Sequence, residues 1–159
     1  LMEWLPKPVI AAVHGHCYTG ALEVALAADF IVASTTARFA DTHAKWALTP
    51  VWGMSQRLPR RVGVSTAKRM MFTGATLKAE EALRVGLAEV VLDNENFIHE
   101  VADMCKTIVD NSSFTHAANK KLIETTDGKS LDGGLQWEVY ASEGVGPDMQ
   151  ARIAAFNKK

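Results

Sequence analysis

A glycine and a glutamate stand together where the sequence changes from a strand to a helix. Residues 9–13 are a short apolar run typical of a buried strand, and residues 21–29 are strong helix formers. Gly20 lies at the entrance of this helix and Glu23 in its first turn. The first N–H groups of a helix have no partner inside it, so a helix start that glycine leaves open can hold an oxyanion or a phosphate. A glycine turn with no further role is the alternative.

Glu23 itself has two interpretations. A carboxylate in a first helical turn interacts favourably with the helix dipole, which is a structural role. Its neighbours Ala21, Leu22, Val24 and Ala25 are apolar and indicate burial, and a buried, unpaired carboxylate is costly. A carboxyl group beside an oxyanion-binding helix start is a natural general acid or base. The residues alone leave both interpretations open.

Three further candidates lie in a segment with no regular pattern, residues 42–64. His43 follows the end of a strand, in the kind of segment where functional residues often gather, although an exposed histidine without a role is the alternative. Trp46 and Trp52 contribute to the core or wall a pocket for an acyl chain. His14 and His16 lack a third ligand nearby, and Cys17 lacks an adjacent base, so we expect neither a metal site nor a thiol nucleophile.

The elements that must position these residues are short strands followed by a helical tail. Strands are predicted at 9–13, 30–33, 37–41 and 88–92. Helices are predicted at 21–29, 54–58, 66–72, 96–110, 113–126, 131–143 and 148–156, and a further helix begins at Thr76 or Lys78 and ends at Val85. Proline and glycine interrupt the rest of residues 42–64. This order predicts one α/β unit with a helical extension.

The composition excludes several classes of protein. The chain has 159 residues, of which 48% are hydrophobic and 22% charged, with a formal net charge of −1. A nucleic-acid-binding protein usually shows a basic excess, and a disordered one has fewer apolar residues. No apolar run approaches the ~18 residues of a membrane span. With 2 cysteines a disulfide scaffold is also excluded.

Several motifs, taken in order, resemble the enoyl-CoA hydratase/isomerase (crotonase) superfamily. Residues 7–15 resemble the family's strand motif KPVIAAVNG, and residues 19–29 resemble its helix motif GGGxELALACD. The segments 39–41, 50–63 and 73–91 continue in register. The similarity runs without a gap from about residue 6 to residue 92 and weakly into the helical tail.

The resemblance implies a fold and a set of roles. The fold is α/β, a partial spiral of ββα turns over residues 1–92 followed by a helical trimerisation region over residues 93–159. Two backbone N–H groups would polarise an acyl-CoA thioester carbonyl, one of them at Gly20, and Glu23 aligns with the first of the hydratase's two catalytic glutamates. The similarity begins partway through the family's subunit, so we expect activity to need an N-terminal portion with the second donor.

The sequence also departs from the family pattern. The second catalytic glutamate falls at position 43, where this chain has His43, an imidazole that can accept or donate a proton near neutral pH. The glycine-rich turn carries one glycine, Gly20, where three are usual. The family's C-terminal CoA-contacting pattern is not recognisable in residues 149–159.

We therefore expect an enoyl-CoA hydratase, a lyase that adds water across a 2-enoyl-CoA thioester. Glu23 would be the general base and acid, His43 its partner, and Gly20 an oxyanion donor, with Trp46 and Trp52 beside the acyl group. Two alternatives remain open. The first is another crotonase reaction, namely isomerisation, thioester hydrolysis or decarboxylation. The second is a subunit that binds CoA without catalysis.

The resemblance extends to partners. The substrate is an acyl-CoA thioester, and no cofactor or metal is expected, because CoA is part of the substrate. Apolar residues in the helical tail, together with the resemblance, predict a homotrimer or a dimer of trimers. We expect no nucleic acid and no membrane span. The expected location is the cytoplasm, or the mitochondrial or peroxisomal matrix in a eukaryote.

Overall fold

The structure, a computed structural model, describes residues 2–157 and divides the chain into two compact units. One unit contains residues 9–104, and the other combines the residues up to Pro8 with those from Cys105 onward. Leu1, Lys158 and Lys159, at the outer ends of the two predicted regions, lie outside the described residues. The division expected after residue 92 is one of function, between a catalytic core and an assembly region. Compactness alone does not test it, so it stays a prediction.

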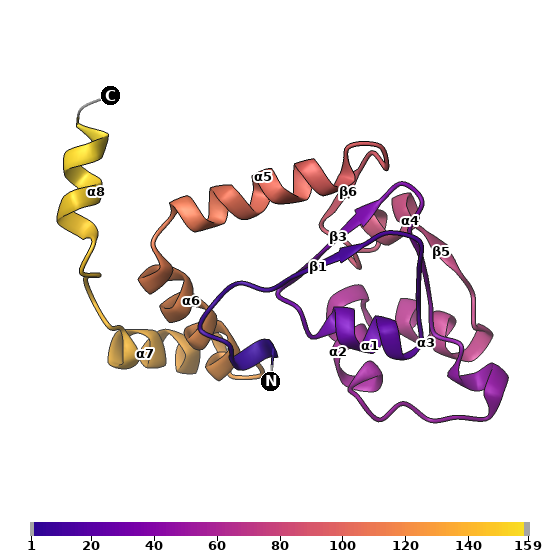
Figure 1. Ribbon diagram of the computed structural model, residues 1–159. Helices are drawn as coiled ribbons and strands as arrows, with labels where there is room; N and C mark the ends of the chain where they lie inside the picture. The colour runs from indigo at the N-terminus through magenta and orange to yellow at the C-terminus, as the bar shows by residue number, and fades with distance from the viewer. Residues whose placement is uncertain (1, 158–159) are drawn as a thin grey trace. The chain divides into compact units, whose positions relative to one another are not determined.

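Two small sheets form the framework of residues 9–104 (Figure 1). In the first sheet β1 (Ile10–Val13), β3 (Phe30–Ser34) and β6 (Val90–Leu92) lie parallel, with β3 in the centre. In the second sheet β4 (Arg38–Ala40) is parallel to β2 (His16–Tyr18) and antiparallel to β5 (Leu77–Lys78). Parallel strands are generally covered on both faces, which explains why β3 is a continuous apolar run.

Strands of successive turns stack on one another. β1 and β2 lead into α1 (Gly20–Leu26), and β3 and β4 then repeat the order, with Ile10 opposite Phe30 and His16 opposite Arg38. This repetition is the spiral of ββα turns that the family resemblance implied. β2 was not predicted, because a strand of 3 residues between a glycine and a turn is recognised only by its pairing with β4.

Three short helices cover the sheets: α2 (Met54–Val62), α3 (Val64–Thr73) and α4 (Ala79–Arg84). Their buried residues join those of the strands and of α1 in one core, whose largest fully buried apolar side chains include Leu22, Ile31, Phe39, Met54, Leu58, Met70, Leu77 and Leu87. The prediction that a helix ends at Leu58 was wrong, since α2 continues through Pro59. Proline removes one backbone donor, but the buried face of Met54, Leu58 and Val62 keeps the helix on the core.

The other unit is helical. The end of α5 (Phe97–Asp110), α6 (Ser113–Thr126), α7 (Leu131–Ala141) and α8 (Met149–Phe156) all occur close to their predicted positions. The Lys120 Nζ donates hydrogen bonds to the carbonyl oxygens of Met2 and Lys7, at 2.9 and 3.1 Å, and so ties the N-terminal residues, including the short helix η1 (Met2–Trp4), to α6.

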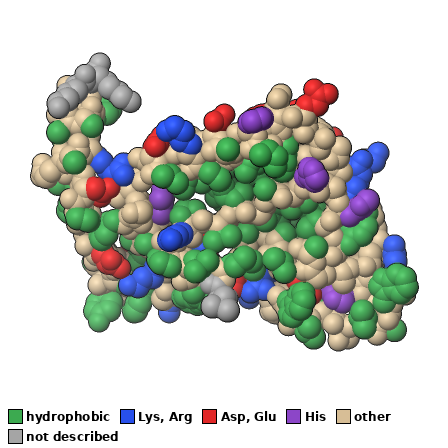
Figure 2. Space-filling view, in the orientation of Figure 1, with side chains coloured by type: hydrophobic (Ala, Val, Ile, Leu, Met, Phe, Trp, Pro, Cys, Tyr) green, Lys and Arg blue, Asp and Glu red, His purple; other side chains and the backbone are tan. Residues whose placement is uncertain are grey.

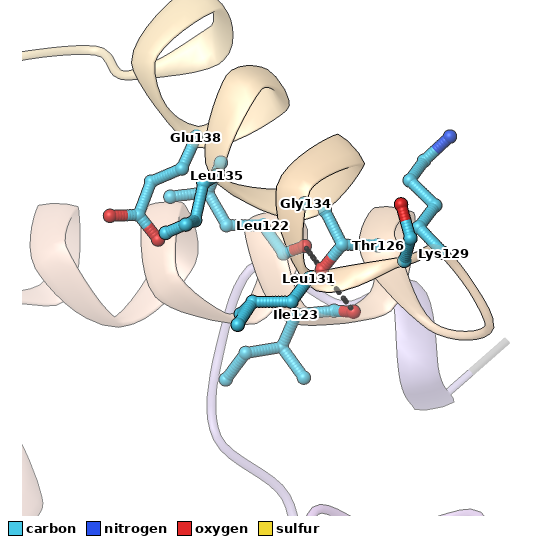
Figure 3. A pocket seen from close by; sticks show the side chains of 9 residues that line it. Leu122, Ile123, Thr126, Lys129, Leu131, Gly134, Leu135 and Glu138 are labelled. Atoms are coloured by element: carbon cyan, nitrogen blue, oxygen red, sulfur yellow. Dashed lines mark hydrogen bonds between the residues drawn. The ribbon is translucent and has the colours of Figure 1, made fainter.

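A pocket of about 300 Å³ lies between α6 and α7 (Figure 3). Leu122, Leu131 and Leu135 supply much of its apolar wall, and Lys129 and Glu138 lie at its edge. Among the helices of residues 2–157, none is long and apolar enough to cross a membrane.

The two cysteines differ in exposure, and this difference predicts their reactivity. Burial raises the pKa of the Cys17 thiol to about 11, whereas Cys105 is exposed. Because the thiolate is the reactive form, at pH 8 only on the order of one Cys17 side chain in 10³ is reactive, and this fraction rises with pH. We expect iodoacetamide to modify Cys105 in the folded protein and Cys17 only after unfolding, as measured by peptide mass spectrometry. Equal labelling of both at pH 8 would contradict this assignment.

Candidate active site

The site lies where two neighbouring parallel strands end. Tyr18, the last residue of β2, is opposite Ala40, the last residue of β4, so the residues that follow both strands emerge at the same edge of the sheet. The Thr19 N–H donates to the Ala40 carbonyl oxygen at 2.9 Å, and the Thr19 hydroxyl is hydrogen-bonded to that of Thr42. These bonds fix the start of α1 beside the short helix η2 (His43–Trp46).

Glu23 is buried in this site, with only 2% of its surface exposed. Its Oε1 accepts hydrogen bonds from the N–H groups of Trp52 and Met54, at 2.9 and 3.1 Å. Both donors flank Gly53, whose φ of +109° lies in the left-handed region that glycine adopts readily. The loop before α2 therefore holds one carboxylate oxygen through backbone atoms and leaves the other available.

His43 is held by a second buried carboxylate. Its Nδ1 lies 2.6 Å from Asp41 Oδ1, and its backbone N–H donates to the same oxygen at 3.1 Å. Asp41 is 1% exposed and His43 is 8% exposed. One buried oxygen of Asp41 therefore holds both the main chain and the ring of His43.

The remaining atoms of the two side chains face each other. His43 Nε2 lies 3.8 Å from Glu23 Oε2, which is longer than a direct hydrogen bond. A water molecule at about 2.8 Å from each atom fits this separation. Three side chains thus form a row, in the order Asp41, His43 and Glu23.

Gly20 and Trp52 meet beside this row. Gly20 is the first residue of α1, where the N–H has no partner inside the helix. A Cβ atom at position 20 would lie 3.1 Å from the ring of Trp52, so the indole packs directly against this glycine. The same Trp52 ring is 61% exposed, which leaves most of its surface open.

Comparison with known proteins assigns the chain to a family. The family model described as enoyl-CoA hydratase/isomerase matches residues 1–144. The chain belongs to the enoyl-CoA hydratase/isomerase family.

Relatives and solved structures in this family are similar over nearly the whole chain. The short-chain-enoyl-CoA hydratase of Clostridium acetobutylicum is 34% identical over 163 residues, covering 99% of this chain and 61% of the relative. The crotonyl-CoA hydratase of Syntrophomonas wolfei is 36% identical over 169 residues, covering 100% of this chain and 65% of the relative. The crystal structure of an enoyl-CoA hydratase from Bacillus anthracis superposes with a TM-score of 0.93 at 34% identity, over 99% of this chain and 62% of that one.

The enoyl-CoA hydratase/isomerase fold expected from the sequence is therefore confirmed. The chain spans about three fifths of the length of the curated relatives quoted above. The similarity extends through the ββα turns and into the helices that follow them.

Four of the five residues predicted for an enoyl-CoA hydratase/isomerase site come together: Gly20, Glu23, His43 and Trp52. Trp46 follows His43 in η2 and is 70% exposed. Among residues 2–157, no group of three or more His, Cys, Asp or Glu side chains has an arrangement that could hold a metal ion.

Sequence reasoning missed two contributors to the site. One is Asp41, which the sequence presented only as the end of the family motif at residues 39–41, with no role of its own. The other is the pair of N–H groups at Trp52 and Met54, which no side-chain pattern reveals.

Proposed function

We propose that this chain carries the acid–base centre of an enoyl-CoA hydratase that adds water across the double bond of a 2-enoyl-CoA thioester. The observation that supports it most directly is the facing pair of Glu23 Oε2 and His43 Nε2, 3.8 Å apart in a buried site. The printed names of the relatives, a short-chain-enoyl-CoA hydratase and a crotonyl-CoA hydratase, support the same reaction.

In the proposed reaction the two side chains divide the transfer of protons. A water held between them loses one proton to His43 Nε2 as its oxygen bonds to the β-carbon of the enoyl group. The π electrons move toward the thioester carbonyl, and the protonated Glu23 carboxyl group gives its proton to the α-carbon. The next water to bind between the two groups relays the proton from Nε2 to Glu23 Oε2, so one water is added and both groups return to their starting states.

The negative charge on the thioester oxygen needs donors that are already in place. The Gly20 N–H is the donor we assign within this chain. It lies at the start of α1, and Glu23 belongs to the first turn of the same helix. We assign no residue of this chain to the second donor of the family's oxyanion hole. Any residue larger than glycine at position 20 would make a tight contact with the Trp52 ring.

Exposed apolar side chains in the segment after His43 support binding of an acyl chain. The Trp52 ring lies over Gly20, and Trp46 stands on the same helix η2 as His43. Large apolar side chains of residues 46–52 are more than half exposed: Trp46, Leu48, Val51 and Trp52. We assign Trp46 and Trp52 to the acyl-binding surface on this basis.

Thioester hydrolysis is the second candidate function, and the Asp41–His43 pair is the observation that favours it. A histidine base oriented by a carboxylate can direct a water at a carbonyl carbon as readily as at a β-carbon. Isomerisation, decarboxylation and CoA binding without turnover have no specific observation in their favour.

The test is to incubate the natural protein that carries this chain with crotonyl-CoA. Hydration removes the ultraviolet absorbance of the conjugated enoyl thioester and yields a product heavier by one water. Hydrolysis instead releases free CoA, which a thiol reagent detects. Release of CoA without a hydrated product would replace the first candidate with the second, and binding without any product would refute both.

Assembly and location stay predictions. α6 and α7 carry large exposed apolar side chains, namely Ile123, Leu131, Leu135, Val139 and Tyr140, and Figure 2 shows hydrophobic side chains over much of the visible face. An exposed apolar surface of this kind supports the proposed homotrimer or dimer of trimers. The cytoplasm remains the proposed location.

A further inference from the structure

A buried carboxylate outside the assigned pair contacts one of its members. Asp41 follows β4 directly and is 1% exposed, so it is removed from solvent almost completely. Its Oδ1 accepts two hydrogen bonds, both from His43: one from the backbone N–H at 3.1 Å and one from the ring Nδ1 at 2.6 Å. A single oxygen therefore fixes both the main chain and the imidazole of the same residue.

We infer that Asp41 is a positioning residue that sets the tautomer of His43, holding the proton on Nδ1 so that the unprotonated Nε2 faces Glu23. This inference rests on the proposed function, since it gives His43 the role of base toward water. A neutral imidazole carries one ring proton, and the nitrogen with the better acceptor keeps it. Asp41 Oδ1 at 2.6 Å from Nδ1 is that acceptor, whereas Glu23 Oε2 lies 3.8 Å from Nε2.

The orientation also matters after the proton has been taken up. When Nε2 accepts a proton from water, the ring becomes a cation in a site with little solvent. The carboxylate of Asp41 stabilises this cation from the other side of the ring without taking its proton. Asp41 does not contact the water or the substrate in this arrangement, so its effect on the reaction passes through His43.

Two variants distinguish the effect of the His43 tautomer on turnover from the effect of the Asp41 charge. In Asp41→Ala no acceptor remains at Nδ1, and the ring proton is free to move to Nε2, which abolishes the base. In Asp41→Asn the backbone N–H of His43, which donates to the same oxygen as the ring contacts, keeps the carboxamide oxygen toward Nδ1, so the tautomer is kept while the charge is lost. We expect turnover to fall by about 10²–10⁴-fold in Asp41→Ala and by less in Asp41→Asn, with KM little changed in both.

The decisive measurement is ¹⁵N NMR of the histidine rings, which distinguishes a protonated from an unprotonated ring nitrogen without any turnover. The His43 signals are assigned by their absence in His43→Ala. We expect the proton on Nδ1 in the unchanged protein and in Asp41→Asn, and on Nε2 in Asp41→Ala. Asp29→Asn is the matched control: Asp29 accepts a hydrogen bond from the Val9 N–H at 2.6 Å, so this variant perturbs a structural carboxylate and leaves the His43 signals in place.

The two proposals fail in different ways. A proton on Nε2 in the unchanged protein, or on Nδ1 in Asp41→Ala, overturns the positioning role even when hydration is observed. The expected tautomers in a protein that does not hydrate enoyl-CoA support the positioning role and refute the proposed function. If Asp41→Ala does not fold, Asp41→Asn decides, because full turnover in this variant would overturn the role of the charge.

Discussion

Glu23→Gln is expected to lower the turnover number for crotonyl-CoA hydration by about 10²–10⁴-fold, or about 3–5 kcal/mol of transition-state stabilisation, in a protein that still folds. The carboxamide oxygen can accept the hydrogen bonds that the N–H groups of Trp52 and Met54 donate to Oε1. The side chain therefore keeps its place. The group that faces His43 becomes an NH₂, which cannot exchange a proton with water or substrate. Steady-state kinetics, with circular dichroism as a check of folding, measures the effect.

Glu89→Gln is the matched control for this substitution. Glu89 also accepts a hydrogen bond from a backbone N–H, that of Ile31 at 2.6 Å, and it pairs with Arg61 at 2.6 Å. It belongs to the same compact unit but to the segment before β6, away from the row of Asp41, His43 and Glu23. We expect a loss of stability with nearly unchanged turnover per folded molecule. Wild-type turnover in Glu23→Gln would remove Glu23 from the reaction.

His43→Ala is the second substitution with a large expected effect, a loss of about 10²–10⁴-fold in turnover. In the proposed reaction the imidazole takes a proton from a water held between it and Glu23, and alanine has no group that can do so. Because the two side chains act on one water, their effects should not add. We expect Glu23→Gln combined with His43→Ala to be only slightly slower than either single variant in the same assay.

A double variant whose losses multiply would mean that Glu23 and His43 act in separate steps. Full turnover in His43→Ala would instead mean that Glu23 works without a partner. Thermal unfolding of each variant distinguishes a chemical effect from a folding defect, because His43 is nearly buried and its removal leaves Asp41 Oδ1 without the ring Nδ1–H.

The strands and helices that place the site were largely predictable from local patterns. The apolar run around Ile31 is continuous because β3 is buried along nearly its whole length, whereas the strand expected to be buried at residues 9–13 has Val13 buried and Ala12 exposed. The tail helices were predicted from their helix-forming segments and the glycine and proline breaks between them. The position of Glu23 in an apolar first turn also marked it as unusual before its partners were known. These signals are local and therefore visible in one sequence.

The features that sequence reasoning missed depend on contacts between distant residues. β2 is a strand only because it pairs with β4, and α2 passes Pro59 because the core holds Met54, Leu58 and Val62. The N–H groups of residues 52 and 54 reach Glu23 across 29 and 31 positions of the chain. Every residue except proline has a backbone N–H, so no sequence motif identifies the ones that donate to Glu23.

The loop at Gly53 has a consequence for how such a site can diversify. Residues 52 and 54 hold the Glu23 carboxylate through atoms that every residue except proline possesses, while the Trp52 indole faces outward beside Gly20. Mutation at position 52 can therefore alter the exposed surface beside Gly20 without releasing the carboxylate. Under the proposed function, selectivity depends on the side chain of residue 52 and acid–base chemistry on its backbone N–H, so descendants of this chain are free to change one and retain the other.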